Sequence, residues 1–203
     1  MTDTKERILQ TSLRLFAAEG YEAVSVSTIA GELGMTKGAL YKHYKNKQDI
    51  FDSIVARMEK QDAEQAGDYD VPEGTVQEME EAYQSTSLEQ MLEYSKAQFR
   101  YWTEDPFAAS FRKMLTLEQF RSERMGELYQ QYLAAGPMGY VADLFDGMGF
   151  ADPQKKAASF YAPMFLLYAV YDGAKESEKA AVTALADACL EQCYRELKKE
   201  RAE

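Results

Sequence analysis

Residues 33–48 carry side chains suited to binding a polyanion. The stretch holds no aspartate or glutamate, although the whole chain has a formal net charge of −11 at pH 7. Its four basic side chains are Lys37, Lys42, Lys45 and Lys47. In an acidic protein, one acid-free basic stretch is typical of a surface that meets phosphate groups. The chemistry indicated is binding to DNA.

Two short helices around a tight turn would position these lysines. Ser25 or Ser27 can cap a first helix that ends near Gly34, and Thr36 can cap a second one through about Tyr44. Gly34 permits the positive φ that a tight turn needs. This order is the pattern of a helix-turn-helix, whose second helix enters the major groove.

The second helix has distinct inner and outer faces. At about 100° per residue, Leu40 and Tyr44 share the inner face, whereas Lys37, Gly38 and Tyr41 lie on the outer arc. The capping residues and basic residues next to this outer arc are also expected to contact DNA. The residues predicted to contact DNA are Ser25, Ser27, Thr36, Lys37, Gly38, Ala39, Tyr41, His43 and Lys47.

Each outward side chain has a use at a duplex. Lys37 can bond a guanine edge or a phosphate, and Ala39 can contact a thymine methyl. Lys47 begins a further helix, whose N-terminal dipole favours phosphate. His43 is the only histidine of the chain. It has no serine or cysteine partner in evidence, so phosphate contact or packing is favoured over catalysis.

Charge is divided unevenly along the chain. Residues 1–60 carry nine basic and eight acidic side chains, a net charge of +1, and the remainder carries −12. An acidic body repels a duplex, so this division indicates that only the N-terminal part meets nucleic acid.

Composition disfavours several other classes of protein. The sequence has no run of about 18 apolar residues and no apolar N-terminal segment, so we expect a cytoplasmic protein without membrane contact. Cys189 and Cys193 are four residues apart on a predicted helix. This spacing favours small packed hydrophobes over a redox or metal role. We expect no metal and no cofactor.

Helical periodicity predicts an all-α protein of about nine helices. We expect residues 1–47 to form a three-helix DNA-binding domain and residues 48–203 a larger helical domain, connected by a helix that starts at about Lys47. A polar break is predicted at 66–76, and Gly136-Pro137 should kink or split the segment 122–145. Asp152-Pro153 should cap and start a long helix.

The larger domain is rich in aromatic and methionine side chains. Beyond Lys60 lie 11 of the 14 tyrosines, 8 of the 10 phenylalanines and the only tryptophan. Such side chains form an ordinary core, and they can also enclose an apolar pocket with phenolic hydroxyls as orienting groups. The candidates to line such a pocket and bind a small molecule are Phe99, Trp102, Phe107, Phe111, Met114, Tyr129, Tyr132, Tyr161, Met164, Phe165 and Tyr168.

Residues 8–54 resemble the N-terminal domain of the tetracycline-repressor (TetR/AcrR) family. The resemblance rests on Gly20-Tyr21, Leu33-Gly34-Met35, Gly38-Ala39-Leu40-Tyr41 and Lys45-Asn46-Lys47. Gly31 departs from the family pattern, where a better helix former is usual, and weakens its helix by about 0.5–1 kcal/mol.

The resemblance implies a homodimer that binds double-stranded operator DNA and a small-molecule effector. It implies that the last two helices, at about 153–172 and 178–199, pair across a two-fold axis, so that the operator is a pseudo-palindrome. The expected function is a ligand-responsive transcriptional regulator, a repressor by family habit.

Two other functions remain open at this point. In the first, the DNA-binding head is kept and the helical body binds a protein partner, which makes the chain an adaptor or architectural protein. In the second, the chain is an enzyme on a helical scaffold. No Gly-rich phosphate loop, nucleophile motif or cluster of histidine, cysteine and acid supports the enzyme.

Overall fold

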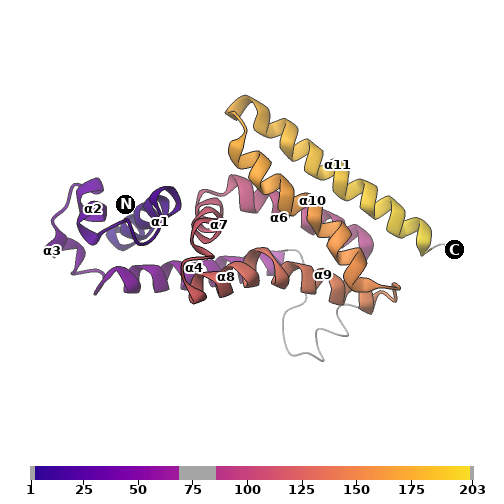
Figure 1. Cartoon of the computed structure of the whole chain (residues 1–203), viewed down its shortest axis with the longest axis horizontal. Helices are drawn as coiled ribbons and strands as arrows, with labels where there is room; N and C mark the ends of the chain where they lie inside the picture. Colours follow the sequence, from indigo (N-terminus) through magenta and orange to yellow (C-terminus); the bar gives the residue numbers. More distant parts are fainter. Residues whose placement is uncertain (1–2, 69–85, 202–203) are drawn as a thin grey trace. The chain divides into compact units, whose positions relative to one another are not determined.

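The computed structural model describes residues 3–68 and 86–201, and these residues form ten helices and no strand (Figure 1). This confirms the predicted all-α architecture. The helices are α1 Thr4–Glu19, α2 Val26–Glu32, α3 Lys37–Leu40, α4 Lys47–Asp68, α6 Leu88–Glu104, α7 Pro106–Glu118, α8 Glu123–Leu133, α9 Ala135–Gly147, α10 Pro153–Gly173 and α11 Glu176–Glu200. None of these described helices is long and apolar enough to cross a membrane.

Two compact units make up the fold. The first consists of Met1–Glu64 and Pro106–Tyr129, and the second of Gln65–Asp105 and Gln130–Glu203. The helix-turn-helix region therefore packs with most of α4, with α7 and with the start of α8. The predicted polar break at 66–76 is wrong at 66–68, because α4 runs to Asp68, and its remainder lies outside the described residues.

In the first unit, α1 packs against α7 and α2. Apolar side chains that α1 places at helical spacing, among them Ile8, Leu13 and Phe16, are at most 1% exposed. Arg57 of α4 ties two neighbours together. Its guanidinium pairs with Glu6 of α1 and lies 4.0 Å from the centre of the Phe107 ring on α7. The N-terminal helices α1 to α4 are therefore packed against α7 as well as against one another.

The third helix is shorter than the range 36–44 expected from the sequence. It spans Lys37–Leu40 and ends in a tightened turn, in which the amides of Lys42 and His43 donate to carbonyls three residues earlier. The next helix starts soon after, because the Asn46 side chain accepts the Asp49 amide at 2.8 Å. The tightened turn therefore ends α3 before Tyr44, and the cap at Asn46 starts α4 directly afterwards.

In the second unit, α10 packs against α9 and α11, and α6 packs against α11. Figure 1 shows α10 and α11 running side by side. Polar side chains fix α6 to α11: Arg100 pairs with Asp187, and Lys96 with Glu191 at 2.9 Å.

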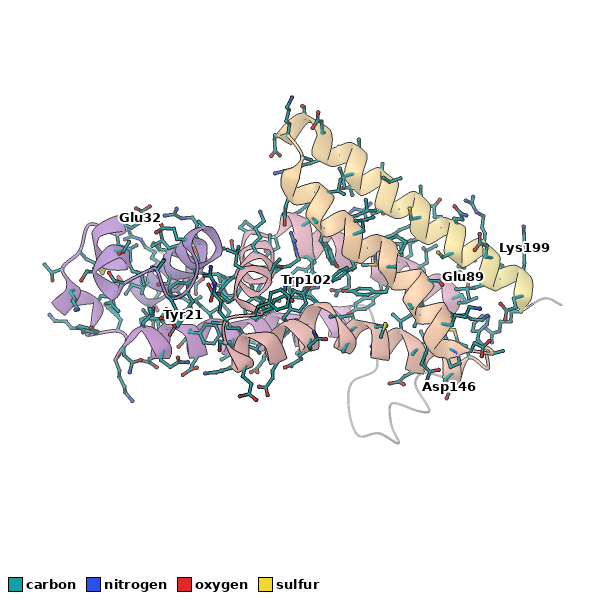
Figure 2. The ribbon with its side chains drawn as sticks, in the orientation of Figure 1. Tyr21, Glu32, Glu89, Trp102, Asp146 and Lys199 are labelled. Carbon is teal, nitrogen blue, oxygen red and sulfur yellow. The ribbon has the colours of Figure 1, made fainter. Side chains whose placement is uncertain are left out.

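Glu89 makes a further tie near the C-terminal end of α11 (Figure 2). It accepts hydrogen bonds from the Tyr194 hydroxyl at 2.5 Å and from the Lys198 ammonium at 3.0 Å. The Tyr194 bond, with help from Lys198, lowers the pKa of Glu89 to about 2.

The predicted break at Gly136-Pro137 is present between α8 and α9. Ala134 leaves the helical conformation, with φ −130° and ψ −94°. Pro137 has no amide hydrogen to donate to the Leu133 carbonyl one turn earlier. The Tyr161 hydroxyl of α10 takes that place and donates to the same carbonyl at 2.8 Å. The split explains why ten helices are seen where about nine were expected.

Two predicted helix starts differ in detail. Asp152 precedes α10 as expected, and Pro153 is the first helical residue, but Asp152 has left-handed backbone angles and its side chain makes no cap bond. A left-handed backbone turns the carboxylate away from the first amides, so the cap prediction is wrong there. The last helix starts at Glu176, two residues before the expected start at about 178.

Candidate nucleic-acid interface

The helix-turn-helix is built from two side-chain caps around one glycine. Ser25 is the N-cap of α2, since its hydroxyl accepts the Thr28 amide at 3.0 Å. Thr36 is the N-cap of α3, where its hydroxyl accepts the Ala39 amide at 3.1 Å. Gly34 lies between them with φ +65°. Caps and turn therefore form at the predicted residues.

Two buried side chains fix the orientation of the second helix. Leu40 is fully buried and Tyr44 is 2% exposed. The Tyr44 hydroxyl donates to the Lys5 carbonyl of α1 at 3.2 Å. Burial, with nearby carboxylates adding to it, raises the pKa of Tyr44 to about 12. The inner face expected from helical spacing is confirmed.

The outer face of α3 is open to solvent. Lys37 and Gly38 are exposed, Ala39 is half-buried, and Tyr41 is 43% exposed although it is a large aromatic. The Lys37 ammonium lies 5.7 Å from the centre of the Tyr41 ring, so these two candidates share one surface. Of the other positions predicted to contact DNA, Ser25, Ser27, Thr36 and His43 are also exposed.

Lys47 differs from the other candidates because it already has partners. Its ammonium donates to the Tyr21 carbonyl at 2.8 Å and lies 4.2 Å from the centre of the Tyr21 ring. Glu22 is a further, longer contact at 3.8 Å. The side chain is 22% exposed. Lys47 therefore holds the loop between α1 and α2, whatever else it contacts.

Sequence reasoning missed two residues that support this surface. The aromatic ring of Tyr21 contacts Phe16 and Phe51, with ring centres 5.0 and 5.4 Å apart. Glu118 of α7 is 1% exposed and accepts the Tyr21 amide at 3.1 Å. The Gly20-Tyr21 pair was a visible signal for the first. No local pattern marks the second, because its partner lies 97 residues away in the sequence.

The described residues offer no metal site. No group of three or more histidine, cysteine, aspartate or glutamate side chains among them lies close enough together to hold an ion. Cys189 and Cys193 are free thiols in partly buried positions. Burial raises the pKa of the Cys193 thiol, which disfavours the reactive thiolate.

The eleven residues predicted to bind an effector do not all fall in one unit. Phe107, Phe111, Met114 and Tyr129 belong to the first unit, and the other seven to the second. Within the second unit, Phe99 stacks on Tyr168 with ring centres 5.4 Å apart, and Trp102 meets Tyr132 at 6.2 Å. Met164 is 4% exposed, and Tyr161 is bonded to the α8–α9 break.

Phe165 stands apart from the other effector candidates, because it is 44% exposed. A groove of about 270 Å³ does exist in the second unit, at the start of α10 and the end of α11. Its lining contains none of the eleven candidates. The lining residues are Asp152, Lys155, Lys156, Ser159, Phe160, Cys193, Glu196, Leu197 and Glu200.

The last two helices carry an exposed apolar face. On α10, Phe165, Leu166 and Val170 are 44%, 64% and 43% exposed, and on α11 Leu185 is 50% exposed. Small side chains lie among them on α11 and are exposed too: Ala180, Ala181, Ala184 and Ala188. Exposed apolar side chains gathered on two neighbouring helices are typical of an interaction face.

Comparison with known proteins supports the predicted family. Residues 8–54 match the family of bacterial regulatory proteins named after TetR. The uncharacterized HTH-type transcriptional regulator YerO of Bacillus subtilis is 50% identical over 50 residues. That match covers 25% of this chain and 17% of YerO, so the likeness to this relative is confined to a small part of its length.

Solved structures extend the likeness to the whole fold. A TetR/AcrR-family transcriptional regulator from Aquifex aeolicus has a TM-score of 0.64 and 18% identity, covering 97% of this chain and 98% of that one. SmeT, the repressor of the Stenotrophomonas maltophilia multidrug efflux pump SmeDEF, has a TM-score of 0.58 and 19% identity, with 95% and 89% coverage. SmeT has also been solved in complex with triclosan.

The N-terminal match and the shared fold agree with the caps, the turn and the outward face described above. They also support the prediction that the chain is a regulator rather than an enzyme. Residues 8–54 are therefore similar to the TetR family of bacterial regulatory proteins, and the fold of the chain is similar to that of solved TetR/AcrR-family regulators.

Proposed function

We propose that the chain is a homodimeric transcriptional repressor that binds a pseudo-palindromic operator through α2 and α3 and acts in the cytoplasm. The observation that carries the proposal is the outer face of α3. Lys37, Gly38 and Tyr41 are exposed there, whereas Leu40 of the same helix is fully buried. A fixed helix with small and basic residues facing outward suits the major groove.

The caps of both helices support the same reading. The exposed Ser25 and Thr36 each accept a backbone amide at the start of a helix, and their hydroxyls can still donate to a phosphate. The proposed contact set is therefore the full one expected from the sequence. Lys47 belongs to it with a second, structural task.

We assign the exposed apolar face of α10 and α11 to a second copy of this chain. In a monomer, this face would leave four large apolar side chains in water, namely Phe165, Leu166, Val170 and Leu185. The neighbouring alanines of α11 let a second α11 approach closely. Two-fold pairing through one face places two copies of α3 in one particle, which is what a palindromic site requires.

A mutation pair tests the dimer. Leu166→Glu, at the most exposed of the four positions, should give a monomer by analytical ultracentrifugation at micromolar concentration. Met138→Glu changes a 41% exposed apolar residue of α9 and should leave the dimer intact. A Leu166→Glu protein that sediments as the wild type does would remove the assignment of this face.

The proposed effector is a small, largely apolar or aromatic molecule. Support comes from the aromatic content of the second unit, where Phe99 stacks on Tyr168 and Trp102 contacts Tyr132. It comes also from SmeT, whose structure has been solved with triclosan. An effector that prefers another arrangement of the protein lowers operator affinity by population shift, and a hundredfold loss needs about 2.7 kcal/mol of coupling.

The test starts with selection of duplexes from a random-sequence library by the purified protein. The proposal expects one enriched sequence with two inverted half-sites, bound more weakly as salt rises. A panel of aromatic and apolar compounds is then titrated against that complex. Enrichment without any effect of the panel would leave DNA binding in place and favour the adaptor with a protein partner.

A further inference from the structure

Glu118 is an acidic side chain enclosed in the first unit. It is the last residue of α7 and is 1% exposed. Buried carboxylates are stable only where donors satisfy them. One carboxylate oxygen accepts the Tyr21 backbone amide at 3.1 Å and the Arg121 guanidinium at 3.1 Å. The Glu118 side chain therefore binds the loop between α1 and α2 through a hydrogen bond.

The loop approaches Glu118 so closely that a larger residue at Gly20 would have to displace the Glu118 side chain. Gly20 has φ +89°, a conformation that other residues rarely adopt. A Cβ atom at Gly20 would lie 2.6 Å from the Glu118 carboxylate and 3.0 Å from the Arg121 guanidinium. The backbone of this loop is thus seated directly on the carboxylate.

Tyr21 connects this loop to the DNA-binding surface through hydrogen bonds. Its amide is held by Glu118, its carbonyl accepts the Lys47 ammonium at 2.8 Å, and its hydroxyl donates to Gln48 at 3.2 Å. Lys47 and Gln48 open α4, directly after the turn that follows α3 (Figure 2 labels Tyr21). One residue therefore joins α7 to both ends of the helix-turn-helix.

We propose that Glu118 is a positioning residue for DNA binding, acting through Tyr21 and Lys47. It touches no DNA itself. Its hydrogen bond fixes the position of the loop before α2 against α7. The position of this loop in turn sets where Ser25 and the start of α4 lie relative to α3. This inference rests on the proposed function and adds a residue that neither the N-terminal match at 8–54 nor the outward face of α3 includes.

The experiment compares two substitutions of Glu118 on the duplex selected by the wild-type protein. Glu118→Ala removes the acceptor, so the Tyr21 amide should exchange its hydrogen faster and affinity should fall about 10-fold. Glu118→Gln keeps an oxygen that can accept the amide and should recover most of both losses. The slope of log affinity against log salt should stay unchanged in both, because no phosphate contact is lost.

Two further variants serve as controls. Glu123→Ala changes an exposed acid at the start of α8 and should bind as the wild type does. Gly20→Ala should lower affinity in both backgrounds, because φ +89° is strained for alanine, and the loss should be smaller in the Glu118→Ala background, where the clash with the carboxylate is absent. If Glu118→Ala fails to fold, Glu118→Asp withdraws the carboxylate and takes its place in the comparison.

The outcomes separate this inference from the proposed function. A wild-type protein that enriches no duplex overturns the proposed function. A wild-type protein that binds, with Glu118→Ala binding within twofold of it, overturns the positioning role alone. Equal losses in Glu118→Ala and Glu118→Gln, or a changed salt slope, would also overturn it.

Discussion

The Lys47 ammonium donates a hydrogen bond to the Tyr21 carbonyl at 2.8 Å and lies 4.2 Å from the centre of the Tyr21 ring. The same lysine is one of the positions expected to grip phosphate. An ammonium that binds one carbonyl and one ring has further N–H donors, and these can still face a polyanion. Lys47 thus connects the stability of the head to its binding surface.

Replacing Lys47 should reveal this double task. Lys47→Ala is expected to lower the free energy of unfolding by about 1–3 kcal/mol, because a charge-assisted bond is lost and a carbonyl is left without it. Lys45→Ala removes an exposed side chain and should change stability by less than about 0.5 kcal/mol. Urea unfolding of both proteins measures the difference, and equal midpoints would contradict the structural task.

Lys37 and Lys42 should separate base reading from phosphate contact. Lys37 lies at the start of α3, so Lys37→Ala should relax the preference at one base pair and cost about 1–3 kcal/mol on the preferred sequence only. Lys42→Ala should weaken all sequences alike and flatten the log–log salt slope by about 0.9. Fluorescence anisotropy on single-base variants of the selected duplex checks both. Identical profiles for the two variants would contradict the assignment.

The predictable part of the fold is the part decided by neighbours in the sequence. The caps at Ser25 and Thr36, the turn at Gly34 and the inner face of Leu40 and Tyr44 all follow from local chemistry, and all are present. Long-range partners could not be predicted in this way. Nothing around Glu118 indicates that its carboxylate meets the Tyr21 amide, because the pairing depends on how α7 packs against α1.

The effector residues were the least predictable part of the molecule for the same reason. Aromatic content does not say which rings pair, nor which ring faces water. Phe165 has the same helical spacing as its buried neighbours Tyr161 and Tyr168, yet it is 44% exposed. The helix α10 is apolar on more than one side, so periodicity alone could not choose the buried face.

Two glycines of the helix-turn-helix should respond to alanine in opposite directions. Gly31 lies within α2, and a Cβ there would meet no atom within 4 Å. Gly31→Ala should therefore raise the free energy of unfolding by about 0.5–1 kcal/mol. Gly34→Ala also meets no atom, but its φ of +65° should cost about 1–2 kcal/mol. Urea unfolding measures both, and a destabilised Gly31→Ala would contradict the account of this departure from the family pattern.

The break between α8 and α9 offers a test inside the second unit. Tyr161→Phe removes the donor to the Leu133 carbonyl and should cost about 1–3 kcal/mol, because that acceptor is buried. Pro137→Ala supplies an amide that can serve the same carbonyl, so the cost of Tyr161→Phe should be smaller in that background. Unfolding free energies of the four proteins complete the cycle. Equal costs in both backgrounds would contradict the view that the Tyr161 hydroxyl replaces the amide that Pro137 lacks.

The most direct test of the central claim is hydrogen exchange on the protein with and without the selected duplex. The claim is that the exposed surface of α2, α3 and the start of α4 reads DNA. The account predicts slower exchange in peptides covering residues 25–47 when the duplex is present, and no such change for a scrambled duplex at the same concentration. Protection that appears only in α10 and α11, or no protection at saturating duplex, would contradict it.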